Sequence, residues 1–91
     1  MIEEEISDID AIIRQLTTID SYKGAESLLF TIEKYPGELD EEQLKIICFA
    51  SMTNEQIYES YICKTPLKII LEKNRDKIND KLLNKVREKI N

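Results

Sequence analysis

The sequence predicts an all-α fold: a small, compact bundle of five helices, or six, that ends in a longer basic helix. Apolar residues recur at intervals of three and four along most of the 91 residues, which is the period of amphipathic helices. Only two glycines and two prolines interrupt them. Isoleucine and leucine far outnumber valine, which favours helices over strands. The length corresponds to one domain, residues 1–91.

Apolar stripes define the first two helices. The first stripe consists of Ile2, Ile6, Ile9, Ile13 and Leu16. Carboxylates at positions 3–5 fall in the first turn of this helix, where they complement the helix dipole. The second helix is expected to begin after Asp20 or Ser21 and to end at Tyr35-Pro36-Gly37, because proline cannot continue a helix and Gly37 supplies a turn. Its apolar face consists of Tyr22, Ala25, Leu28, Leu29 and Ile32.

A capping box predicts the start of the third helix. Asp40 stands three residues before Gln43, so each side chain is placed to bond the backbone N–H of the other residue. Leu39 and Leu44 flank this pair at the spacing of a hydrophobic staple. Residues 44–50 are apolar nearly all round, so this helix is expected to be the most buried one.

The same pattern predicts a fourth helix. Thr53 and Gln56 form a second capping box, and Met52 and Ile57 flank it as a second staple. We expect the fourth helix to follow the third after a very short connection.

Thr65, followed by Pro66, predicts the start of the last helical segment. From there one apolar stripe continues through Leu67, Ile70, Leu71, Ile78, Leu82, Val86 and Ile90. Asn74 and Asn79 are compatible with a break near residue 79, so residues 66–90 form one helix or two. The favoured prediction is one helix, straight or slightly kinked.

The composition argues against catalysis. There is no histidine, which removes the commonest general base and metal ligand. The densest carboxylate runs, residues 3–5 and 40–42, fall at predicted helix starts, where they have a structural role. We therefore expect no enzyme activity, no catalytic residue, no cofactor and no metal. Cys48 and Cys63 are expected to be buried, reduced thiols, although the sequence leaves a disulfide between them open.

The sequence predicts a cytoplasmic protein without a membrane span. No run approaches the roughly 18 apolar residues that a spanning helix needs. The N-terminus is acidic, whereas a signal peptide begins with basic residues.

Charge is unevenly distributed along the chain. Residues 1–63 hold 4 basic and 14 acidic side chains, whereas residues 64–91 hold 9 basic and 4 acidic ones. Within the basic part, lysines recur at every fourth position: Lys73, Lys77, Lys81, Lys85 and Lys89. On one helix they form a row, which is either a solvated face or a surface for an anionic partner. Lys73, Lys77, Lys81 and Lys85 are accordingly candidate partner-binding residues.

Two tyrosines are the other candidates for partner binding. Tyr58 and Tyr61 stand three residues apart and are expected to share one face of the fourth helix. Tyrosine is favoured at interfaces because it combines apolar area with a hydroxyl group, but it is equally common at the edge of a small core.

Part of the chain resembles a known DNA-binding motif. The residues in question are Leu39-Asp-Glu-Glu-Gln-Leu-Lys-Ile-Ile, Met52-Thr-Asn-Glu-Gln-Ile and Pro66-Leu67. They resemble the helix-turn-helix of LuxR-type regulators, in which a scaffold helix precedes a capped recognition helix. The resemblance implies a helix at residues 66–78 that presents Lys68, Lys73, Arg75 and Lys77 to DNA.

The expected function is binding to another macromolecule, most favourably a protein. A bacterial or phage-encoded inhibitor, an immunity protein and a small regulator all fit this description, although this is an association between a class of sequence and a class of function. A helix-turn-helix regulator formed by residues 39–78 is the alternative, with nucleic acid as the less favoured partner. The isoleucine stripe of the first helix also suits a homodimer, since a small bundle has little spare core. The sequence leaves open the partner's identity and whether a small ligand binds between subunits.

Overall fold

The computed structural model describes the backbone of residues 2–90 and the side chains of residues 9–90. In chain order its elements are α1 (Ile2–Gln15), α2 (Tyr22–Lys34), α3 (Glu41–Thr53), α4 (Glu55–Tyr58), α5 (Tyr61–Lys73), the 3-10 helix η1 (Arg75–Lys77) and α6 (Asp80–Ile90). Residues 2–90 thus contain six α-helices and no strand, which confirms the predicted all-α bundle.

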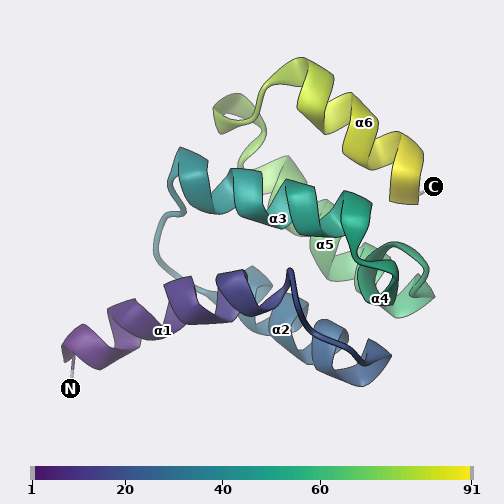
Figure 1. Ribbon diagram of the computed structural model, residues 1–91. Helices are drawn as coiled ribbons and strands as arrows, with labels where there is room; N and C mark the ends of the chain where they lie inside the picture. The colour runs from purple at the N-terminus through teal and green to yellow at the C-terminus, as the bar shows by residue number, and fades with distance from the viewer. Residues whose placement is uncertain (1, 91) are drawn as a thin grey trace.

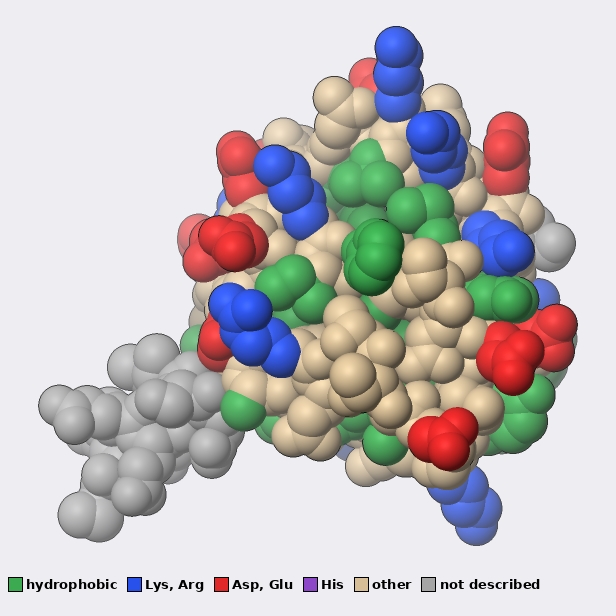
Figure 2. All heavy atoms as spheres, viewed as in Figure 1, with side chains coloured by type: hydrophobic (Ala, Val, Ile, Leu, Met, Phe, Trp, Pro, Cys, Tyr) green, Lys and Arg blue, Asp and Glu red, His purple; other side chains and the backbone are tan. Residues whose placement is uncertain are grey.

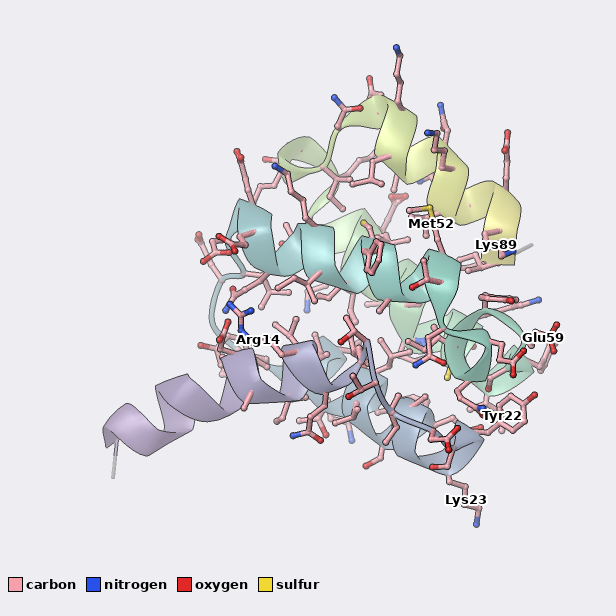
Figure 3. All side chains as sticks on the ribbon, in the orientation of Figure 1. Arg14, Tyr22, Lys23, Met52, Glu59 and Lys89 are labelled. Atoms are coloured by element: carbon pink, nitrogen blue, oxygen red, sulfur yellow. The ribbon has the colours of Figure 1, made fainter. Side chains whose placement is uncertain are left out.

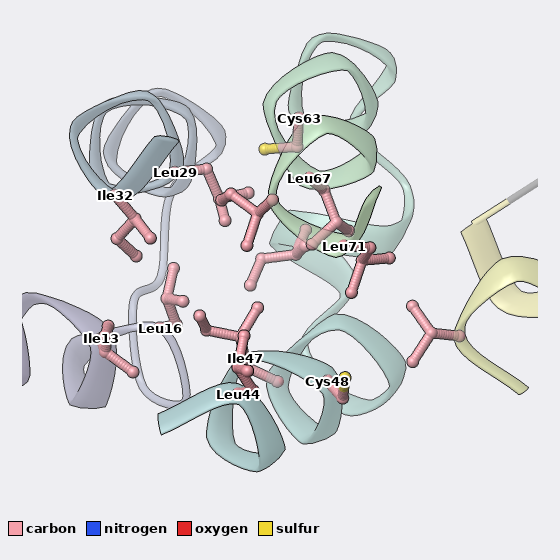
Figure 4. Close-up of a cluster of buried hydrophobic side chains, with 14 of the residues drawn as sticks. Ile13, Leu16, Leu29, Ile32, Leu44, Ile47, Cys48, Cys63, Leu67 and Leu71 are labelled. Carbon is pink, nitrogen blue, oxygen red and sulfur yellow. The ribbon is translucent and has the colours of Figure 1, made fainter. Parts of the chain in front are cut away.

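The core lies mainly between α1, α2, α3 and α5. Helix α2 contacts α1, α4 and α5, while α3 contacts α1, α4 and α6. Leu16, which follows α1, converges with Leu29 of α2, Ile47 of α3 and Leu67 of α5, and all four are fully buried (Figure 4). Figure 1 shows α6 on the opposite side of α3 from α1 and α2. Among the described helices, none is both long enough and apolar enough to cross a lipid bilayer.

The apolar stripes of α1 and α2 face this core. Ile9 and Ile13 of α1, and Leu16 just after it, are buried as predicted, while Ile2 and Ile6 lie outside the described side chains.

Helix α2 begins where Ser21 predicts, because the Ser21 hydroxyl accepts a hydrogen bond from the Gly24 N–H at 3.0 Å. Its first residue, Tyr22, is exposed and does not belong to the buried face. The helix ends at Lys34, before Pro36, with Tyr35 extended. Gly37 does not supply a left-handed turn, since no described residue has a positive φ. It is instead covered by the Tyr35 ring, whose atoms lie 2.7 Å from the position that a Cβ at residue 37 would occupy.

The capping box at the start of α3 is confirmed. The Asp40 carboxylate accepts from the Gln43 N–H at 2.7 Å, and the Gln43 side-chain oxygen accepts from the Asp40 N–H at 2.9 Å. Leu39 and Leu44 are both buried in the core cluster.

The predicted second capping box is wrong. Thr53 is the last residue of α3, and its hydroxyl donates back to the Phe49 carbonyl. Asn54 is the N-cap of α4, because its Oδ1 accepts from the Gln56 N–H at 2.9 Å. The Asn54 amide group also donates to the carbonyls of Leu16 and Ile19, at 2.8 and 3.0 Å. These long-range hydrogen bonds explain why Asn54, and not Thr53, is the N-cap of α4.

The predicted start at Thr65-Pro66 is also wrong. Helix α5 begins at Tyr61, and its N-cap is Ser60, whose hydroxyl accepts from the Cys63 N–H at 3.3 Å. Pro66 is buried inside this helix. Because proline has no N–H, the Ile62 carbonyl lacks its usual donor four residues later.

The predicted single helix over residues 66–90 is two helices. Asn74 ends α5, since its amide donates to the Ile70 carbonyl at 2.8 Å. Asn79 begins α6, since its Oδ1 accepts from the Lys81 N–H at 2.8 Å. Between them Ile78 is extended and buried, so the break allows this side chain to join the core.

Candidate functional site

The break after α5 divides the predicted row of lysines. Lys73 ends α5 and donates through Nζ to the Glu33 carbonyl at 3.3 Å. Lys77 belongs to η1 and donates to the Leu39 carbonyl at 3.1 Å and to the Glu38 carboxylate at 3.3 Å. Lys73 therefore links the ends of α2 and α5, and Lys77 links η1 to the segment after α2. The continuous basic row predicted from the sequence is not formed.

The other three lysines of the row belong to α6. Lys81 and Lys85 are exposed, and neither forms an ion pair within the described part of the chain. Lys89 lies over the Tyr58 ring, with Nζ 4.2 Å from the ring centre, which is a cation–π contact between α6 and α4. Of the four candidate lysines, only Lys81 and Lys85 are thus free to meet a partner.

The two candidate tyrosines do not share a helix face. Tyr58 is the last residue of α4 and is half-buried beneath Lys89. Tyr61 is the first residue of α5 and is 85% exposed. Ser60, the N-cap of α5, separates them, so the structure does not bring Tyr58 and Tyr61 together as one surface.

The helix expected at residues 66–78 for DNA reading is not present as one helix. Helix α5 ends at Lys73, and Arg75 lies in η1, where it forms a 3.8 Å ion pair with Glu72. Of the four basic residues implied by the resemblance, Lys68 alone projects from the middle of α5 without an ion pair among the described side chains. The exposed side of α5 instead carries Tyr61, Ile62 and Ile69.

Both cysteines are buried and free, as expected. Burial raises the pKa of the Cys48 thiol to about 11. Burial also raises the pKa of Cys63, and the Ser60 hydroxyl opposes this in part. Both thiols are therefore neutral at pH 7, which is the state of inert core cysteines.

An apolar surface on the outer side of α3 was not predicted from the sequence. Its centre is Phe49, which is 56% exposed. Ile46 and Met52 stand three residues to either side of Phe49 on α3, and Leu82 belongs to α6, which packs on α3; each of the three is partly buried against the core. We call these four residues the Phe49 face. Figure 2 shows hydrophobic side chains gathered at the centre of this side of the molecule, and Figure 3 shows Met52 projecting from α3 toward α6.

Charged residues of both signs border the Phe49 face. Asp40, Glu41, Glu42 and Lys45 line a hollow with Thr17, Ile46 and Phe49. Glu41 and Lys45 also line a small pocket between α3 and α6, together with Leu82. Lys81 and Lys85 are exposed on α6, and like Lys45 they form no ion pair among the described side chains.

The signal for this face was present in the sequence. Residues 44–50 are apolar nearly all round, and the helices that α3 contacts most are α1, α4 and α6. Leu44, Ile47 and Cys48 point into the core, which leaves Phe49 on the outside. An apolar helix in so small a domain has one apolar side left in water.

No group of three or more Asp, Glu, His or Cys residues within the described part of the chain is arranged to hold a metal ion. Comparison of the chain with family models, with curated proteins and with solved structures finds no match. The helix-turn-helix resemblance thus remains an interpretation of the sequence.

Proposed function

We propose that this chain is a non-catalytic protein-binding domain, of the kind found in small inhibitors, immunity proteins and regulators, and that its partner docks on the Phe49 face. The observation that carries the proposal is Phe49 itself, a large aromatic residue that is 56% exposed at the centre of an apolar surface. Aromatic residues in this position, with apolar neighbours and a charged rim, are typical of binding hot spots.

Docking a partner over Phe49 adds to the free energy of binding. Full burial of a phenylalanine side chain is worth about 1.5–3 kcal/mol. Phe49 already has part of this gain, so covering the rest contributes about 1–1.5 kcal/mol, or about tenfold in affinity. Lys45, Lys81 and Lys85 favour a partner with carboxylates at the corresponding edge, because matched charges orient the encounter.

The experiment is affinity capture of the partner from the cells that encode the chain. Phe49→Asp places a charge at the centre of the face without entering the core. Ile69→Asp is the matched control, because Ile69 is 40% exposed on α5 and lies outside the face. We expect Phe49→Asp to lose the captured protein and Ile69→Asp to retain it.

Equal capture by both variants would remove the support for the Phe49 face. A duplex DNA mobility shift that weakens steeply with salt, and that Lys68→Gln abolishes while Phe49→Asp does not, would favour the helix-turn-helix alternative instead.

A further inference from the structure

We propose that two copies of this chain form a symmetric dimer through the Phe49 face, with the N-terminal end of α3 in each copy against α6 of the other. The proposal rests on the proposed function, because it names the partner that docks on the same surface. A second copy is the partner that matches the charges around this face.

The N-terminal end of α3 carries an excess of negative charge. The hollow beside Phe49 is lined by three carboxylates, which we call the acidic end of α3: Asp40, Glu41 and Glu42. Among the described residues that line this hollow, Lys45 is the one base, so three negative charges stand against one positive charge. None of the three carboxylates forms an ion pair with a described side chain. The hollow therefore favours ammonium groups supplied by a partner.

Helix α6 carries positive charge next to the same surface. Lys81 and Lys85 are exposed, and they stand one residue before and three residues after Leu82, the α6 member of the Phe49 face. Neither forms an ion pair among the described side chains. Figure 2 shows basic side chains over α6 and acidic side chains near the start of α3, around the central hydrophobic group. One apolar centre thus has charges of both signs at its border.

The two charged regions lie at about the same distance from Phe49. Glu42 stands seven residues before Phe49, so it lies on the same side of α3, about 10 Å along the axis. Leu82 shares a pocket with Lys45, and α3 and α6 run in roughly the same direction (Figure 1). About one turn further along each helix, Lys85 therefore lies beside Phe49. The separation of packed helices, about 8–10 Å, sets the distance between them.

These equal distances allow a two-fold arrangement. A rotation that brings the two Phe49 rings together also places the acidic end of each copy against Lys85 of the other. Every contact then forms twice, and the dimer closes without further association. The residues named above are fewer than the roughly 20–30 per copy of a stable interface, so we expect a weak dimer.

The first experiment measures the self-association of the purified full chain. Sedimentation is followed from about 1 µM to about 1 mM, the range in which a weak dimer dissociates. We expect a monomer–dimer equilibrium without larger species, which shifts toward monomer as salt is raised. Phe49→Asp places two carboxylates against each other and should raise the dissociation constant about tenfold or more. The matched control Ile69→Asp should leave it unchanged. Circular dichroism confirms that each variant is folded.

Exchanging the charges tests the pairing between α3 and α6. Glu42→Lys and Lys85→Glu each turn two attractive contacts of the symmetric dimer into two repulsive ones, so each variant alone should dimerise about tenfold less well. Mixed one to one, the two variants present opposite charges at both contacts. The mixture should therefore associate where neither variant does so alone. Glu59→Lys and Lys68→Glu make the same charge changes at exposed positions outside the face, and mixing them should give no gain.

Three results overturn the inference. The first is a wild-type chain that stays monomeric at about 1 mM. The second is a dimer that Phe49→Asp does not weaken, and the third is a mixture of the two charge variants that associates no better than each does alone. The proposed function would still stand if capture of another protein depended on Phe49, so the two ideas fail separately.

Discussion

Asn54 is the residue at which one side chain joins three segments of the fold. Its Oδ1 caps α4 by accepting from the Gln56 N–H, and its Nδ2 donates to the carbonyls of Leu16 and Ile19 in the segment that follows α1. Asn54→Ala removes all three hydrogen bonds, and it leaves two carbonyl groups without this donor.

The expected loss follows from these three bonds. A lost helix N-cap costs about 1 kcal/mol. Each neutral hydrogen bond to a backbone carbonyl contributes a net of about 1 kcal/mol or slightly less. We therefore expect Asn54→Ala to lower the free energy of unfolding by about 2–3 kcal/mol. For a domain of this size that corresponds to a fall in Tm of about 10–20 °C.

Two further variants separate the roles of this side chain. Thr53→Ala is the matched control, because the Thr53 hydroxyl only donates back within α3, and its loss should change stability by less than about 0.5 kcal/mol. Asn54→Asp keeps the capping oxygen but places a carboxylate against two carbonyl oxygens, so it should be at least as destabilising as alanine. Urea unfolding followed by circular dichroism measures all three. If Thr53→Ala and Asn54→Ala cost the same, or if Asn54→Asp restores stability, the reasoning is refuted.

Two other predictions concern Lys77 and Cys48. Lys77→Met keeps the aliphatic stem but loses the bond to the Leu39 carbonyl, so unfolding should become easier by about 1 kcal/mol, while Lys81→Met should have almost no effect in the same urea titration. The pKa of the Cys48 thiol is raised by burial to about 11 from an ordinary 9.0, so the folded state keeps a proton that the unfolded state loses. Stability is therefore complete below about pH 9 and falls toward pH 11, by at most about 2–3 kcal/mol. Subtracting the same pH series measured on Cys48→Ala isolates this contribution; identical slopes in the two series would contradict it.

Helix starts were predictable where the deciding bonds are local. The two partners of the α3 capping box, Asp40 and Gln43, stand within one turn, and the sequence places them correctly. Thr53 and Asn54 are both favourable N-cap residues. The carbonyl groups of residues 16 and 19 favour Asn54, because they accept hydrogen bonds from its side chain. These residues are too far away in the sequence for a pattern within one helical turn to include them.

The lysine row shows why a repeat of four does not define one helix. Lys73 and Lys77 keep the spacing of the row, but each finds a carbonyl oxygen in a segment about forty residues earlier. The Asn74 side chain ends α5 by donating to the Ile70 carbonyl. The Asn79 side chain begins α6 by accepting from the Lys81 N–H. Whether residues 66–90 form one helix or two therefore depends on tertiary contacts, which the spacing of the lysines does not reveal.

The Phe49 face was missed for a different reason. Periodicity indicates that α3 is apolar on every side, but it does not say which side the other helices leave uncovered. That depends on where α1 and α6 pack, and those positions follow from the complete fold.

The packing of α6 gives the chain an intrinsic reporter of local opening. Helix α6 docks mainly on α3 through Leu83, Val86 and Ile90, and Cys48 lies on the side of α3 that faces it (Figure 4). Detachment of α6 exposes this buried sulfur to a thiol reagent. The rate at which the reagent modifies Cys48 therefore measures how often the C-terminal helix separates from a body that is otherwise still folded.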